Sequence, residues 1–376
     1  MSGIIDYLKW RGDLPFGADP FNEVDSLILS ELVYVDYADL PDEMTDVSLE
    51  EAYYRYLKKN PAAGTQPDAP GSEKILLLKT AAGEPRFKNS RLCFFVNEHD
   101  KELDHHFHHF TALTFLLDDG TAFAAFRGSD HTFVSWKDAL DLSYMEETAG
   151  QRRAVSYFNS LDRLPDRPLR TGGHSKGGNL AVYGAAFSSP EIQDRILEIY
   201  SYDGPGFRDE VIMSGEYRRI LPKTISIIPD ASVIGRLMQN AAVPRVVRST
   251  AVGLAQHNAF TWCVERNHFA YTGISEFGIF LDRSVEAWTG QMDSKTRESL
   301  ILSIFKLLEG TGKQSFRELK TEKLKTLEAL LTGMNELPED KRQEVLRMAK
   351  QLVESGRDTL RTGISDYLEA RKKAQQ

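Results

Sequence analysis

Hydrophobic residues in the first part of the chain recur at helical spacing. The segment PFNEVDSLILSELVYVDYADL carries apolar residues three and four positions apart, and LEEAYYRYLKKN follows with the same period. The Pro-, Gly- and Ala-rich segment at residues 60–73 predicts a loop, and SEKILLLKTAAG then resumes the amphipathic pattern. The pattern therefore predicts a helical N-terminal region, residues 1–89, that packs on the rest of the molecule.

From about residue 90 the pattern changes to alternating strands and helices. FTALTFLLDDGTAFAAFRGSD predicts two strands joined by a turn at Asp119 and Gly120. The helix-like segments are SWKDALDLSYM, ETAGQRRAVSYFNSLDRL and GNLAVYGAAF, and the strand-like segments are RPLRTGG, ILEIYSYDG, KTISIIPD and RVVRSTAVG. Such alternation predicts an α/β core over residues 90–275, with a mostly parallel sheet and helices on both faces.

Strand signals stop after about residue 275. The segments SLILSIFKLLEG, LKTLEALLTGMNEL and PEDKRQEVLRMAKQLVESG are amphipathic, and the last places Pro338 in the first turn of a helix. We therefore predict a C-terminal helical region, residues 276–376. It is expected to pack on the core or to join two copies of the chain as a homo-oligomer.

Composition excludes several classes of protein. The net charge of −9 and the absence of a Lys/Arg block disfavour nucleic-acid binding. Cys93 and Cys263 are far apart and outside any CxxC pattern, which indicates neither a disulfide framework nor a zinc module. No uncharged apolar run approaches the roughly 18 residues of a membrane span, and Asp6 and Lys9 interrupt the N-terminal apolar stretch, which is unlike a signal peptide. We expect a cytoplasmic protein.

The segment RTGGHSKGGNLAVYGAAF contains the strongest chemical motif. Ser175 lies in Gly-His-Ser-Lys-Gly, which satisfies the GxSxG pattern, with a predicted strand before it and a predicted helix after it. This is the setting of a nucleophile elbow, in which the serine hydroxyl is exposed on a strained turn. The alternative is a glycine-rich loop without catalytic function.

A nucleophilic serine needs a base and an acid that orients the base, and in this fold they follow the serine in the order acid, histidine. His257 follows the last predicted strand closely and is the preferred base, with His268 as the alternative. For the acid, Asp230 at the end of TISIIPD is preferred, and Asp203 at the end of EIYSYDG is the alternative. Each aspartate has a structural explanation: Asp203 as a turn residue and Asp230 as a helix N-cap.

An oxyanion hole requires two N–H donors. The backbone of Lys176, directly after the nucleophile, is one candidate. The strand-to-helix loop in AFAAFRGSDHTFVSWKD supplies the second at Ser129, through its backbone and its hydroxyl. The alternative is that Ser129 and the residue after it only cap the next helix.

Several of these motifs together resemble a known family. AFRGSD, GHSKGGNLA, YSYDGPGF, IIPDASVIG and QHNAFTW, with DYLKWRGDLPF at the start, are similar to a bacterial α/β-hydrolase family of unknown function that is related to the class-3 lipases. The resemblance covers roughly residues 1–310 and implies the α/β-hydrolase fold. It also implies a triad of Ser175, Asp230 and His257, with Ser129 in the place of the oxyanion threonine of the lipases.

The sequence departs from that family pattern in two places. Lys176 replaces the usual apolar residue after the nucleophile, and together with Arg127 it would place positive charge near the pocket, which would suit a substrate with a carboxylate or phosphate. The alternative is that the Lys176 side chain points away from the pocket and forms a surface salt bridge. The position of Asp230 is not always acidic in the family, which keeps Asp203 as a candidate.

The histidine-rich segment DHHFHHF suggests a metal site, but strand alternation would divide its histidines between two faces, and a polar start of a strand explains the segment better.

The sequence as a whole predicts a serine hydrolase of short- or medium-chain acyl esters, without metal or organic cofactor. Residues 206–222 and 231–244 are expected to cover its site. The alternative is an inactive α/β-hydrolase scaffold that serves as a binding module.

Overall fold

The computed structural model describes most of the chain. The described residues are 2–37, 47–61, 71–103, 106–130, 132–164, 167–276, 278–279, 294–313 and isolated positions between 318 and 346. They divide into two compact units, one formed by residues 1–129 and 146–289 and the other by residues 130–145 and 290–376. The three-part division expected at residues 89 and 275 stays a prediction.

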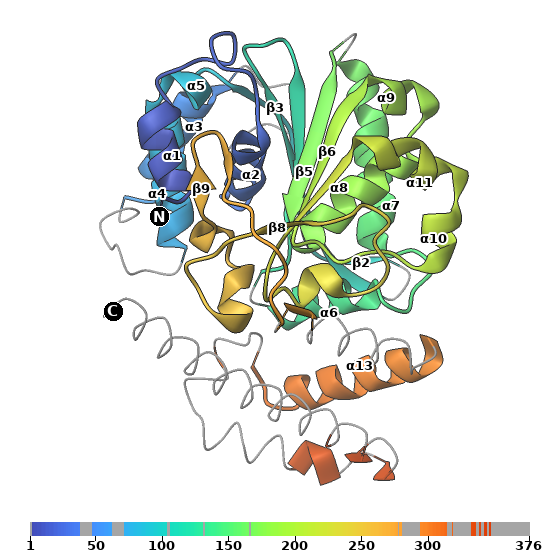
Figure 1. The fold of residues 1–376 in the computed structure, drawn as a ribbon. Helices are drawn as coiled ribbons and strands as arrows, with labels where there is room; N and C mark the ends of the chain where they lie inside the picture. Colours follow the sequence, from blue (N-terminus) through green and yellow to red (C-terminus); the bar gives the residue numbers. More distant parts are fainter. Residues whose placement is uncertain are drawn as a thin grey trace, which may run out of the picture. The chain divides into compact units, whose positions relative to one another are not determined.

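An eight-stranded sheet forms the centre of the first unit (Figure 1). Its strands lie side by side in chain order: β1 Val47–Ser48, β2 Arg91–Leu103, β3 His106–Leu116, β4 Ala122–Phe126, β5 Leu169–His174, β6 Ile196–Tyr202, β7 Thr224–Pro229 and β8 Arg245–Val247. The pairs from β1 to β4 are antiparallel, and those from β4 to β8 are parallel. The predicted hairpin is confirmed between β3 and β4, where Gly120 has a positive φ of 83°.

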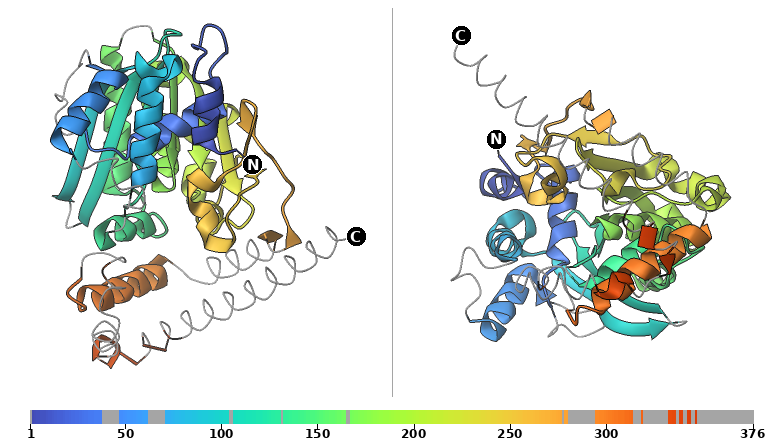
Figure 2. Two further views of the ribbon diagram at one scale, coloured as in Figure 1. Left: turned by 90° about the vertical axis from the view of Figure 1, so that its left-hand side faces the viewer. Right: turned by 90° about the horizontal axis from the view of Figure 1, so that it is seen from below.

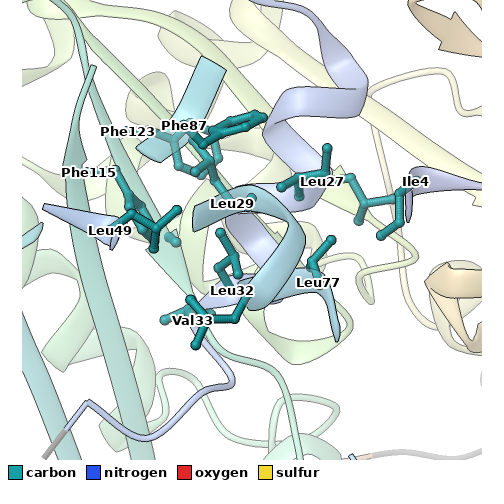
Figure 3. Packing of buried hydrophobic residues seen from close by; sticks show 14 of the residues in the cluster. Ile4, Leu27, Leu29, Leu32, Val33, Leu49, Leu77, Phe87, Phe115 and Phe123 are labelled. Carbon is teal, nitrogen blue, oxygen red and sulfur yellow. The ribbon is translucent and has the colours of Figure 1, made fainter. Parts of the chain in front are cut away.

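The N-terminal helices pack on one face of this sheet, as Figure 2 shows from their side. They are α1 Ile4–Arg11, α2 Glu23–Leu32, α3 Leu49–Lys59, α4 Ser72–Gly83 and α5 Pro85–Lys88. A continuous apolar cluster joins Leu27, Leu29 and Leu32 of α2 to Phe115 and Phe123 of the sheet (Figure 3). The predicted helical N-terminal region therefore forms part of the core of the first unit.

A capped and ion-paired junction anchors α2. The side chain of Asn22 accepts the backbone N–H groups of Val24 and Asp25, and the Asp25 carboxylate accepts the N–H of Asn22 in return. The same carboxylate pairs with Arg86 at 2.5 Å, and neither side chain is exposed. Because removal of one partner would leave a buried charge, we expect its loss to cost about 3–5 kcal/mol.

Helices between the parallel strands pack against a second apolar cluster. They are α7 Ala149–Ser160, α8 Lys176–Phe187, α9 Pro190–Arg195, α10 Asp209–Met213 and α11 Gly215–Ile220. Phe126 of β4 stacks on Phe158 of α7 at a ring separation of 5.4 Å, and Tyr157 meets it edge-on. Helices on both sheet faces confirm the α/β architecture that the pattern predicted, and with the additions at both ends of the chain they give the α/β-hydrolase fold that the family resemblance implied.

The second unit contains α6 Phe133–Asp141 and α13 Ser294–Glu309. Phe133 and Tyr144 pack with Ile301 and Phe305, and Arg297 donates to the carbonyl of Ser143. The helix expected in SLILSIFKLLEG is thus present, whereas most of the two later helical segments lies outside the described residues. Their packing on the core and the homo-oligomer stay predictions.

The remaining elements of the first unit are short. They are the ribbon of β9 Val264–Glu265 and β10 His268–Phe269 and the 3₁₀ helices η1 Leu161–Arg163, η2 Leu221–Lys223, η3 Ile234–Arg236, η4 Gly253–His257 and η5 Ala259–Thr261. Across the described ranges, no helix combines the length and the apolar character that a membrane crossing requires.

Candidate active site

Ser175 lies on a strained turn between β5 and α8. Its φ of 59° and ψ of −132° are unusual for a residue with a side chain. The turn is tight because the neighbouring backbones nearly touch: a Cβ atom on Gly173 would lie 2.3 Å from the carbonyl of Gly177, and one on Gly177 would lie 2.1 Å from the carbonyl oxygen of Phe126. The glycines of the motif are therefore required sterically, as expected for a nucleophile elbow.

A second strained turn follows the adjacent strand. β5 and β6 are parallel neighbours with His174 opposite Tyr202, so Ser175 and Asp203 leave the sheet side by side at its carboxyl edge. Asp203 also has a positive φ, 48°, and the N–H of Ser175 donates to the carbonyl of Tyr202 at 2.8 Å. Two polar side chains are thus presented together at the edge where sites of α/β sheets lie.

The Asp203 carboxylate is completely buried and accepts several hydrogen bonds. The Ser232 hydroxyl and the Gly235 N–H donate to its Oδ1, the latter at 3.1 Å. His257 Nδ1 lies 2.6 Å from its Oδ2. The Ser232 hydroxyl and the Gly235 N–H therefore fix the carboxylate in place beside the ring of His257.

His257 ends η4 and reaches Asp203 from the loop after β8. The preceding residue helps to hold this loop, because the carbonyl of Gln256 accepts the Trp262 indole N–H at 2.8 Å. The His257 side chain is 29% exposed, in contrast to its partner. A histidine oriented by a buried carboxylate and open to solvent on its other side has the arrangement of a general base.

The preferred acid of the sequence analysis, Asp230, does not contact His257. Its carboxylate accepts the N–H and the hydroxyl of Ser275 at 2.7 and 2.6 Å. The strand order explains the difference, because β7 is one strand farther from β5 than β6 is. The register of β6 and β7 increases the separation further. Tyr202 pairs with Ile227, so Asp230 lies farther beyond the end of the paired strands than Asp203 does. The expected N-cap role is also absent, since Val233 is the cap of η3.

The loop after β4 lies beside the nucleophile. A Cβ atom on Gly128 would lie 3.1 Å from the Cβ of Ser175, which brings the following residue, Ser129, to the site. The N–H of Gly128 is held by the Tyr34 hydroxyl at 3.0 Å. Lys176 begins α8, so its N–H lies in the first turn of the helix, whose N–H groups point away from the helix body. Both predicted oxyanion residues therefore adjoin Ser175, and their function stays a prediction.

The Lys176 side chain does not present its charge to solvent. The residue is 2% exposed, and its Nζ donates to the carbonyl of His109 at 2.9 Å. The Arg127 guanidinium lies over the Tyr34 ring, 5.6 Å from its centre. The expectation that Lys176 contributes an open positive charge to the pocket is therefore wrong, because its ammonium group is engaged inside the protein.

The other histidine hypotheses receive no support. His268 is exposed on β10, and its Nδ1 faces the carbonyl of Phe269 rather than an acid. In the segment DHHFHHF, β3 begins at His106, and His105 lies outside the described residues. No group of His, Cys, Asp and Glu side chains within the described part of the chain is arranged to hold a metal ion.

Comparisons with known proteins identify one family and several solved structures to which the chain is similar. The family model Mbeg1-like matches residues 81–306, and no curated protein matches the chain. Among solved structures, a fungal lipase in complex with an inhibitor is 12% identical over 65% of this chain and 79% of its own, with a TM-score of 0.34. The Lip2 lipase from Yarrowia lipolytica is 12% identical over 63% and 92%, also with a TM-score of 0.34. A lipase from Rhizopus microsporus var. chinensis is 12% identical over 70% and 91%, with a TM-score of 0.32.

Proposed function

The chain belongs to the Mbeg1-like family, and we propose that it is a serine hydrolase that cleaves acyl esters through an acyl-enzyme on Ser175. The observation that carries this proposal is the 2.6 Å contact between His257 and the buried Asp203, at the sheet edge where Ser175 occupies its elbow. Asp203 takes the role that the sequence analysis preferred for Asp230.

In the first half of the reaction, His257 Nε2 removes the proton from the Ser175 hydroxyl while the oxygen attacks the ester carbonyl carbon. The resulting tetrahedral intermediate carries an oxyanion. When it collapses, the carbon–oxygen bond to the alcohol breaks, and His257 returns the proton to the departing alkoxide. Asp203 fixes the tautomer of His257 and stabilises its imidazolium form.

In the second half, His257 activates a water molecule that attacks the acyl carbon. The acid leaves, and the proton returns to Ser175. The N–H groups of Ser129 and Lys176 stabilise the oxyanion in both halves. Their positions, one on the loop beside the nucleophile and one in the first turn of α8, support this assignment.

The substrate assigned to this site is an ester with a short or medium acyl chain. The segment that supplies Ser232 and Gly235 to the acid also carries half-buried Ile234, Leu237 and Met238, an apolar surface next to the triad. Because Lys176 is turned into the protein, nothing about its side chain calls for an anionic substrate.

A p-nitrophenyl ester series assayed with EDTA tests this function. We expect turnover of short and medium chains by the full chain and loss of turnover in Ser175→Ala. Turnover that survives this substitution, or that collapses in EDTA, would contradict the mechanism. A preference for long chains would overturn only the substrate assignment. A well-folded protein inactive on every ester would favour the scaffold hypothesis.

A further inference from the structure

We propose that Glu31 and His174 form a second carboxylate–histidine pair, in which His174 is doubly protonated and holds the backbone of the base, His257. The role of the pair in catalysis rests on the proposed function, whereas its protonation does not. Both are positioning residues: neither is assigned a contact with the substrate.

Each ring nitrogen of His174 lies next to an oxygen atom that can accept a proton. His174 ends β5, directly before the nucleophile, and its side chain is 10% exposed. Its Nε2 lies 2.8 Å from the carbonyl oxygen of His257, and its Nδ1 lies 3.1 Å from Oε1 of Glu31 on α2. The rings of His174 and His257 are 4.7 Å apart and inclined by 33°.

These two contacts determine the number of protons. A backbone carbonyl oxygen only accepts, so Nε2 must donate to His257. A neutral ring would then place an unprotonated Nδ1 3.1 Å from an oxygen of the buried Glu31 carboxylate, and the two electron-rich atoms would repel each other. The pair therefore holds a second proton in addition to the one on Nε2. This second proton lies either on Nδ1 of His174 or on the carboxyl group of Glu31.

The surroundings of Glu31 favour the ionised carboxylate. Its side chain is 2% exposed, and Lys74 Nζ lies 3.9 Å from its Oε2. Burial alone raises the pKa of Glu31, but attraction to His174, with smaller contributions from Lys74 and His257, lowers it below its ordinary value. The second proton accordingly resides on His174, which makes the pair a buried imidazolium–carboxylate pair.

This pair links three parts of the active site. Through it, α2 of the N-terminal region holds the residue before the nucleophile, and that residue holds the loop of the base. Trp262 meets the His174 ring edge-on at 6.3 Å and supports the same loop. The charged and titratable groups that face the pair are Lys74 on α4 and the His257–Asp203 pair. Loss of the second proton would remove the ion pair between His174 and Glu31, and with it the link from α2 to the ring that holds the base.

NMR of the full chain labelled with ¹⁵N at histidine tests the protonation directly. In Ser175→Ala, which is inactive under the proposal, one histidine with protons on both ring nitrogens near neutral pH is expected. It should disappear in the double variant Ser175→Ala/His174→Gln. A neutral His174, with one protonated and one unprotonated nitrogen, would overturn the assignment whether or not the chain is a hydrolase.

Ester hydrolysis tests the positioning role. His174→Ala is expected to lower kcat by roughly ten- to a hundred-fold with little change in KM, because the base is misplaced while the pocket is kept. In Glu31→Gln, the alkaline fall in kcat/KM should move to lower pH, because the negative charge that retains the second proton is lost. An unchanged alkaline limb in Glu31→Gln would contradict the positioning role.

Glu98→Gln is the matched control, because Glu98 forms a partly buried ion pair with Arg153, away from the two histidines. It should leave the pH profile of the wild type unchanged. A shift of the same size in this control would show that loss of any ion pair produces the effect, which would overturn the specific role of Glu31.

Discussion

His257 and His174 lie against each other, and each faces a deeply buried carboxylate, yet their surroundings prepare them for different tasks. Asp203 holds one nitrogen of His257, and no hydrogen bond to its Nε2 occurs within the described part of the chain. In His174, Nε2 is hydrogen-bonded to the carbonyl of His257, and Nδ1 lies 3.1 Å from the carboxylate of Glu31. The difference teaches that a buried acid beside a histidine does not by itself indicate a base. The second nitrogen must also be available for proton transfer.

The largest expected difference between the two histidines is in turnover. His257→Ala should lower kcat by about 10⁶-fold, because the serine loses its proton acceptor. His174→Ala should retain most of the catalytic machinery and lose far less activity. Steady-state kinetics on one p-nitrophenyl ester measures both. Equal losses of kcat in the two variants would show that the two histidines do not have the different tasks proposed for them.

The two aspartates sharpen the assignment of the acid. Asp203→Asn should lower kcat by about 10⁴-fold, because it removes the charge that stabilises the imidazolium and allows the wrong tautomer. Asp230→Asn, which changes a contact to Ser275, should change kcat by no more than a few-fold. Measurement of kcat for both variants decides which aspartate is the acid. A larger fall in kcat for Asp230→Asn than for Asp203→Asn would restore Asp230 as the acid.

The smallest expected effect is the pH dependence of the folding stability that the Glu31–His174 pair contributes. The pKa of Glu31 in the folded chain is below its ordinary value of 4.5, so its ionisation contributes stability above that pH. This contribution is lost as the pH falls through the lowered pKa. Glu31→Gln should therefore be less stable than wild type at neutral pH, with a difference that shrinks on acidification. Urea unfolding at several pH values measures it, and a difference that does not vary with pH would contradict the ionised carboxylate.

The residues that we propose as nucleophile and base could be selected from local sequence. GxSxG between an apolar strand and a helix defines an elbow because backbone sterics require those glycines, and His257 follows at a short distance after β8, the last strand of the eight-stranded sheet. The acid could not be decided in this way. Asp203 and Asp230 both end apolar strands, and the choice depends on the strand order and the stagger of β6 and β7.

Contacts between distant segments left no signal in the sequence. Glu31 reads as a polar residue of an amphipathic helix, and only the packing of α2 against β5 brings it to His174. Ser232 and Gly235 likewise belong to a loop whose register the pattern does not define. The direction of the Lys176 side chain could not be decided from the sequence, because residue type alone does not show where a side chain points.

The most direct test of the central claim is covalent labelling of the full chain by a fluorophosphonate, with the modified residue identified by mass spectrometry. The account predicts one adduct on Ser175, strongly slowed labelling in His257→Ala and Asp203→Asn, and none in Ser175→Ala. Absence of any adduct on folded wild-type protein, or an adduct on another residue that persists in Ser175→Ala, would contradict it.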